Sequence, residues 1–114
     1  MLENMPFTKV YVITGYTDMR NGIAGLAALV RLRYRLDTLE EGTLFLFCGR
    51  SCKKFKGLFW EGSGYCLISK TLIKGAFQWP RNADEARAIS RTEFQMLMSG
   101  FPIESRIPGA RMSA

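Results

Sequence analysis

The amino-terminal third of the chain changes from a strand-like to a helix-like pattern of apolar positions. Residues 7–14 are rich in β-branched and aromatic side chains and end at Gly15, so they are predicted to form a strand. Apolar residues then recur at the three- and four-residue spacing of a helix at Met19, Ile23, Leu26 and Val30. With Thr17 or Asp18 as the N-terminal cap, this spacing predicts one long helix over residues 18–36.

The middle of the chain consists of short apolar or alternating stretches separated by glycine-containing turns. The predicted strands cover residues 44–48, 55–60, 65–71 and 76–79. Connections this short join antiparallel neighbours, because a parallel pair needs a crossover of about a dozen residues or more. The pattern therefore predicts a small antiparallel β-meander of four to five strands.

The last part of the pattern carries the signals of a second, shorter helix. Pro80 ends the last predicted strand, and residues 82–88 are predicted to be a connector. Ser90 and Glu93 have the spacing of a capping box, in which each side chain accepts from a free backbone amide of the other residue. An apolar stripe follows these residues, and Gly100 stands where a helix commonly ends. The fold class predicted is α+β, with the meander, one long N-terminal helix and one short C-terminal helix.

Length and composition fit a single domain. A chain of 114 residues with 47% hydrophobic residues can bury roughly two thirds of its unfolded surface. We expect one domain over residues 7–101, an N-terminal extension at 1–6 and a flexible C-terminal tail at 102–114. No apolar run approaches the ~20 residues of a membrane-spanning helix, and residues 1–6 lack the features of a secretory signal. We therefore expect a cytoplasmic protein without a membrane partner.

The sequence offers little material for catalysis or metal binding. It contains no histidine, which removes the usual general base, and its three cysteines are odd in number and lack Cys-x-x-Cys spacing. Structural zinc sites use four Cys or His ligands. The carboxylates show no paired, motif-like spacing, as metal-dependent DNA strand transfer would need. We therefore expect no catalytic residues, no metal and no cofactor, and the protein is not predicted to be an enzyme.

Positive charge is concentrated in the middle of the chain. Residues 42–83 contain seven basic residues and one acidic residue, Glu61, and this difference accounts for the whole net charge of +6. The candidate nucleic-acid-binding residues are Arg50, Lys53, Lys54, Lys56, Lys70, Lys74 and Arg81. Such a segment suits phosphate binding, because each Lys or Arg that displaces a counterion adds affinity for nucleic acid. Aromatic residues are interleaved with these positions and could stack on unpaired bases.

The same pattern has an alternative interpretation without nucleic acid. Aromatic residues that alternate along strands usually form a core face, and lysines opposite them usually form a solvated face or protect a sheet edge. Charge alone therefore leaves both interpretations open.

The segments described above resemble a known family. They are Gly-Tyr-Thr-Asp-Met-Arg at 15–20, Leu-Phe-Leu-Phe-Cys-Gly-Arg at 44–50, Phe-Lys-Gly-Leu-Phe-Trp-Glu-Gly at 55–62 and Phe-Gln-Trp-Pro-Arg at 77–81. In order and spacing they are similar to the accessory protein called TnpB in the sixty-six family of bacterial insertion sequences, which is unrelated to the RNA-guided nuclease of that name. The chain departs from the family pattern at five positions: the family commonly has Lys in place of Asn21, Arg in place of Ser51 and Thr71, Asp in place of Lys53 and Glu in place of Ile73. These departures leave the segment positive but argue against a fixed set of arginines.

The resemblance implies an accessory role beside a separate, larger transposase that performs the strand chemistry. The implied partners are DNA at the ends of the element, the transposase, and other accessory proteins of the same element. Two hypotheses follow. In the first, the protein binds DNA through the basic hairpin surface; in the second, that surface docks on the transposase and has no DNA affinity of its own.

Overall fold

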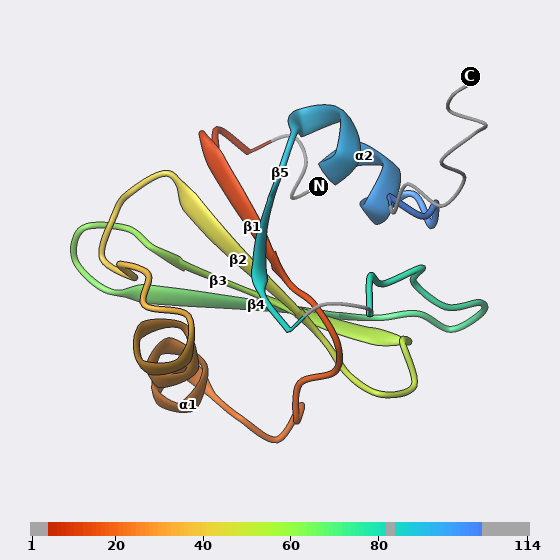
Figure 1. The fold of residues 1–114 in the computed structure, drawn as a ribbon, viewed down its shortest axis with the longest axis horizontal. Coiled ribbons are helices and arrows are strands. Elements are labelled where there is room, and N and C mark those ends of the chain that lie inside the picture. Colours follow the sequence, from red (N-terminus) through yellow and green to blue (C-terminus); the bar gives the residue numbers. More distant parts are fainter. Residues whose placement is uncertain (1–4, 82–83, 104–114) are drawn as a thin grey trace.

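A computed structural model describes residues 5–81 and 84–103, which form one mixed sheet with short helices on both faces (Figure 1). The order of the five strands is β4-β3-β2-β1-β5. The strands are β1 Lys9–Ile13, β2 Thr43–Cys48, β3 Lys54–Trp60, β4 Tyr65–Thr71 and β5 Ala86–Ile89. The helices are α1 Ile23–Ala28, which continues as the π-helical segment η2 Leu29–Arg33, and α2 Arg91–Met98.

The prediction of a purely antiparallel meander was wrong, because β1 pairs with β2 in parallel. Lys9 lies opposite Thr43 and Val12 opposite Leu46, and the crossover between the strands carries α1 and η2. The meander is confined to β2, β3 and β4, where the connections are short enough to force antiparallel pairing. Every residue of β2 is buried, as expected of a central strand that is covered on both faces.

The fifth strand lies in a different segment from the one predicted. Residues 76–79 form no strand; instead Phe77 and Trp79 are buried, and the Trp79 indole Nε1 donates to the Ile13 carbonyl at 3.0 Å. The strand β5 occupies the predicted connector and pairs antiparallel with the free edge of β1. Phe77 and Trp79 alternate with exposed residues because their buried side chains anchor this segment to the rest of the fold, and the segment pairs with none of the described strands.

The single long N-terminal helix was also wrong. The helical turns begin at Ile23, with Gly22 at the cap position and no side-chain cap, so neither Thr17 nor Asp18 caps the helix. Residues 14–22 instead form a loop that crosses the end of the sheet. The Thr17 amide holds this loop in place by donating to the Cys48 carbonyl at 2.8 Å. The apolar face was predicted correctly: Leu26, Ala27 and Val30 are buried.

The short C-terminal helix is confirmed, together with both of its caps. The Ser90 hydroxyl accepts from the Glu93 amide at 3.1 Å, and the Glu93 carboxylate accepts from the Ser90 amide at 2.9 Å. At the other end Gly100 has φ +90°, and the amides of Gly100 and Phe101 donate to the Leu97 and Met96 carbonyls. This is the Schellman arrangement, which favours glycine because the left-handed conformation strains other residues.

Two apolar cores lie on opposite faces of the sheet. One unites Val12, Leu46 and Phe55 with Phe94 and Leu97 of α2. The other places α1 and η2 against residues of the opposite face, among them Ile13, Phe45, Phe47 and Leu58. Alternate residues of the central strands supply both cores, so the helices can hold the sheet from either side.

The edges of the predicted domain lie partly outside the described residues. Met5 packs against the α2-side core, and Ile103, two residues past the predicted end of the domain, is buried in it. Of the predicted extension and tail, residues 1–4 and 104–114 lie outside the described part of the chain. Within that part, no helix is long and apolar enough to cross a membrane.

Candidate nucleic-acid interface

The seven predicted basic residues converge on one end of the sheet. Strand β2 finishes there, β3 begins there and β4 finishes there, so Lys54 lies opposite Thr71, and Phe55 opposite Lys70. We call this region the basic end; it comprises Arg50, Lys53, Lys54, Lys56, Lys70, Lys74 and Arg81. The loops after β2 and β4 project at the right of Figure 1, and the hairpin between β3 and β4 lies at the far left. Antiparallel pairing thus brings Lys70 beside the start of β3, where Lys54 lies.

Two adjoining pockets open beside the basic end, on the two sides of the loop formed by residues 14–22. One has a volume of about 500 Å³ and is lined by Arg33, Tyr34 and Asp84, among others; the second, of about 510 Å³, is lined by Arg50 and Lys54. The wall that both pockets share is Tyr16, Thr17 and Asp18. Loops that follow the carboxyl ends of parallel strands are common places for ligand sites, because the crossover leaves a crevice there.

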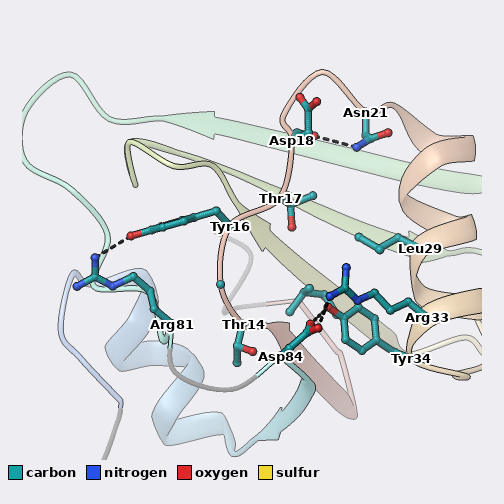
Figure 2. A pocket seen from close by; sticks show the side chains of 12 residues that line it. Thr14, Tyr16, Thr17, Asp18, Asn21, Leu29, Arg33, Tyr34, Arg81 and Asp84 are labelled. Carbon is teal, nitrogen blue, oxygen red and sulfur yellow. Dashed lines mark hydrogen bonds and ion pairs between the residues drawn. The ribbon is translucent and has the colours of Figure 1, made fainter.

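Tyr16 joins three segments that are far apart in the sequence. Arg81 Nη1 donates to the Tyr16 hydroxyl at 2.7 Å, and the two side chains point toward each other (Figure 2). The guanidinium carbons of Arg50 and Arg81 lie 5.6 and 6.0 Å from the centroid of the Tyr16 ring. Each such cation–π contact contributes on the order of 0.5–1 kcal/mol at an exposed site. The Gly15 amide also donates to the Pro80 carbonyl at 2.9 Å, so side chains and backbone both hold this junction.

Lys56 has a different environment from the other basic residues. Its Nζ donates to the carbonyls of Met19 and Asn21, each at 2.8 Å, and the side chain is half-buried. These carbonyls belong to the turn immediately before α1. Lys56 therefore ties β3 to the loop that forms the wall of the pockets, and its ammonium is directed inward.

The remaining basic residues differ in exposure and in the face of the sheet they occupy. Arg50, Lys53, Lys74 and Arg81 are exposed, whereas Lys54 and Lys70 are half-buried. Lys54 shares the α1-side face of β3 with Lys56 and Leu58, while Lys70 shares the α2-side face of β4 with Ile68. Positive charge consequently surrounds this end of the sheet instead of covering one face.

Three acidic residues lie near the basic end, and local contacts hold the carboxylates of two of them. The Asp18 carboxylate accepts from the Arg20 guanidinium at 2.7–3.1 Å and from the Arg20 amide at 2.9 Å, and these hydrogen bonds lower the pKa of Asp18 to about 2. Asp84 accepts from Arg33 and from the Tyr34 hydroxyl, which lowers the pKa of Asp84. Burial and Asp84 together raise the pKa of Tyr34 to about 12. The third, Glu85, contributes its backbone carbonyl to Thr14.

The cysteines and carboxylates form no reactive arrangement in the described part of the chain. Burial, reinforced by neighbouring Cys52, raises the pKa of the Cys48 thiol well above its usual range, so it stays protonated and is a poor nucleophile. A hydrogen bond with Glu61 raises the pKa of Cys66. Within residues 5–81 and 84–103, no three Cys, Asp or Glu side chains come together as metal ligands.

The sequence pattern singled out the basic residues but not the other polar side chains beside them. Tyr16, Asn21 and Asp84 line the first pocket, and none had been singled out as functional. A signal was available for Tyr16: it lies directly after a strand and a glycine, ahead of a helix and a second, fully apolar strand. That order is typical of a parallel crossover unit, whose first loop lies at the carboxyl end of the sheet.

Comparison with known proteins gives a family match. Residues 8–107 match the family described as IS66 Orf2-like protein. Two similar proteins come from Sinorhizobium fredii strain NGR234. The uncharacterized protein y4hO is 40% identical over 100 residues, which cover 88% of this chain and 86% of the relative. The uncharacterized protein y4jC is 35% identical over 92 residues, which cover 81% and 78% of the two chains. No solved structure matches significantly.

Proposed function

Because the chain belongs to the family of IS66 Orf2-like proteins, we propose that it is a non-catalytic accessory protein of a bacterial insertion sequence that assists DNA transposition by binding DNA at the basic end of its sheet. The strand chemistry then belongs to a separate transposase. The protein acts in the cytoplasm, where the DNA of a bacterium lies.

The observation that carries this proposal is the segregation of charge along the sheet. The basic end holds seven cations beside Asp18 and Asp84, which are each paired with an arginine. The opposite end, where β2 begins and the hairpin joins β3 to β4, holds Glu40, Glu41 and Glu61 with Lys9. We call this the acidic end. A surface with an excess of positive charge attracts the polyanionic DNA backbone over a Debye length of about 10 Å in 0.1 M salt and orients its approach.

We assign the phosphate contacts to three exposed residues, Arg50, Lys53 and Lys74, and to the half-buried Lys54, which lines the second pocket. Lys56 acts by holding the wall of the pockets in place through its two backbone contacts. Arg81 has the same supporting role toward Tyr16. About four phosphate contacts correspond to a slope of roughly −3 to −4 in a plot of log affinity against log salt concentration.

The carboxylates support a role without catalysis. Asp18 and Asp84 are each bound by an arginine, and Glu93 caps α2. A metal-dependent strand transfer needs several carboxylates that converge on two ions, whereas these three carboxylates are each engaged in a separate local contact.

Fluorescence anisotropy with duplex DNA from the element's end, and with a scrambled duplex, tests the proposal at several salt concentrations. We expect salt-dependent binding by the wild type, and a slope less negative by about 2 in the variant Lys53→Ala/Lys54→Ala, since each lost contact removes about 0.9. The matched control is Lys9→Ala/Arg31→Ala, which removes the same charge outside the basic end. An equal loss in the control would mean that net charge alone governs binding.

Absence of binding even at low salt would refute direct DNA contact. Capture of the purified transposase by the same basic end would then favour the docking hypothesis. Binding to both duplexes with equal affinity would retain DNA contact and assign recognition of the element's ends to the transposase.

A further inference from the structure

The loop that follows β4 is fixed to the basic end at both of its sides. On one side the Leu72 amide donates to the Lys53 carbonyl at 2.7 Å, and on the other the Phe77 amide donates to the Cys52 carbonyl at 2.7 Å. Leu72 packs against the α2-side core, and Phe77 is buried within it, with its ring 5.2 Å from that of Phe55. Gly75 has φ +77°, a conformation that favours glycine, and it turns the chain between these anchors. The short segment 73–76 is therefore presented on a fixed base.

The tip of this loop exposes a large apolar side chain among cations. Ile73 is 90% exposed, compared with 70% for Leu32 and 59% for Phe101. Lys74 follows it directly, Lys70 lies near the end of β4, and the backbone of Lys53 is bonded to the base of the loop. Single exposed apolar residues are common on protein surfaces and need no explanation by themselves. Here the side chain stands at the tip of a projecting, anchored loop, next to Lys74 in sequence and on the same end of the sheet as the other cations (Figure 1).

We infer that this loop acts as a wedge in DNA, an inference that rests on the proposed DNA binding. Ile73 inserts between neighbouring base pairs from the minor groove, while Lys53 and Lys74 bind the phosphates on either side. The insertion bends the duplex. Side chains of this type unstack a base step partially and kink DNA by roughly 20–90°. A β-branched side chain is suited to the role because it is stiff about χ1 and loses little freedom on insertion. The function added to simple binding is the shaping of DNA within the transposition complex.

Energy transfer between dyes on the two ends of a short duplex measures the bend. The wild type should bring the ends closer together, whereas Ile73→Ala should leave the duplex nearly straight, with an unchanged salt slope and less than about a tenfold loss of affinity. Ile73→Leu should retain the bend. The matched control is Leu39→Ala, which removes an exposed apolar side chain next to Glu40, at the acidic end. Because the Ile73 side chain is almost fully exposed, its replacement should not unfold the protein.

A second measurement uses the cost of unstacking. A duplex with a two-base mismatch is already partly unstacked, so the wild type should bind it more tightly than the matched duplex. Ile73→Ala should lose this preference. Equal bending by Ile73→Ala and the wild type, or a wild-type complex with straight DNA, would overturn the wedge and leave DNA binding intact. No wild-type binding to any duplex would overturn the proposed function and the wedge together.

Discussion

The two ends of the sheet are built from the same strands but differ in charge and in the length of their connections. At the acidic end a four-residue hairpin joins β3 to β4, and Glu40 pairs with Lys9 at 3.0 Å. At the basic end the connections are longer, and they meet around Tyr16. Each end also has a pocket; that of the acidic end has about 470 Å³ and is lined by Glu41 and Glu61. Pockets therefore do not distinguish the two ends, and the location of charge does.

The largest effects should come from the core and should not distinguish the ends. Phe55, near the basic end, meets Phe77 edge to face at 5.2 Å, and Phe59, near the acidic end, meets Phe7 in the same way at 5.1 Å. Truncation of either ring leaves a cavity, so Phe55→Ala and Phe59→Ala should each lower the free energy of unfolding by about 3–5 kcal/mol. Urea denaturation followed by circular dichroism measures both. A large loss at one position only would mean that the ends also differ in how they support the fold.

Charge reversal should separate the ends most clearly. Each lost phosphate contact costs about eightfold in affinity at 0.1 M salt, so Lys53→Glu/Lys54→Glu should weaken DNA binding by about 60-fold or more. The reverse change at the acidic end, Glu41→Lys/Glu61→Lys, should alter affinity by less than about threefold. The seven residues of β3 span about 20 Å, or roughly two Debye lengths. If the affinity of both variants follows net charge alone, the ends are equivalent and the proposed interface is wrong.

The sequence predicted the elements whose signals are local. Three predicted elements have signals that come from residues close together in the sequence, and all three are confirmed. They are the strand within residues 7–14, the meander of β2 to β4, and α2 with its two caps. The start of α1 and the position of β5 depend on partners far along the chain. Thr17 is held by Cys48, and β5 completes the edge of β1. The spacing of apolar residues along a short stretch of sequence contains no information about such long-range pairings. It therefore predicted a helix over residues 18–22, which form part of the loop at the pockets.

The same limit applies to the candidate site. Counting charge along the chain located the basic segment, because antiparallel strands fold neighbouring segments onto one end of the sheet. It could not assign different roles to its members. Lys56 meets the Met19 carbonyl across 37 positions, and Arg81 meets Tyr16 across 65. The charge pattern alone contains neither contact, and our proposal that Lys56 and Arg81 support the pocket wall depends on the three-dimensional structure.

This division of roles within the basic end predicts opposite outcomes for two neighbouring lysines. Lys56→Met retains the apolar stem but removes two charge-assisted hydrogen bonds, so it should lower the free energy of unfolding by about 2 kcal/mol. Lys54→Met should change stability by less than about 0.5 kcal/mol. In DNA titrations the order is reversed: Lys54→Met should make the salt slope less negative by about 0.9, and Lys56→Met should leave it unchanged. A stable Lys56→Met protein with a reduced slope would assign Lys56 to phosphate instead.

The smallest effect concerns Asp18, one of the acidic residues near the basic end. Hydrogen bonds from Arg20 lower the pKa of Asp18 to about 2 from 3.8, so the folded state favours the ionised form. The stabilisation from this pair should therefore be fully present above about pH 4 and should disappear as the pH falls through about 2. Because both side chains are exposed, the change in stability should be small, and the titration midpoint of the Asp18 carboxyl carbon in NMR is the sharper measurement.

In Arg20→Ala that midpoint should move toward 3.8, since the lowering of the pKa depends on the hydrogen bonds from Arg20. In Lys9→Ala, which removes a cation at the acidic end, it should stay near 2. A wild-type midpoint near 3.8 would show that the Asp18–Arg20 pair does not persist in solution. Arg20 would then be an additional cation at the basic end. In that case the slope of log affinity against log salt concentration should be more negative, by about 0.9, than the slope expected for four phosphate contacts.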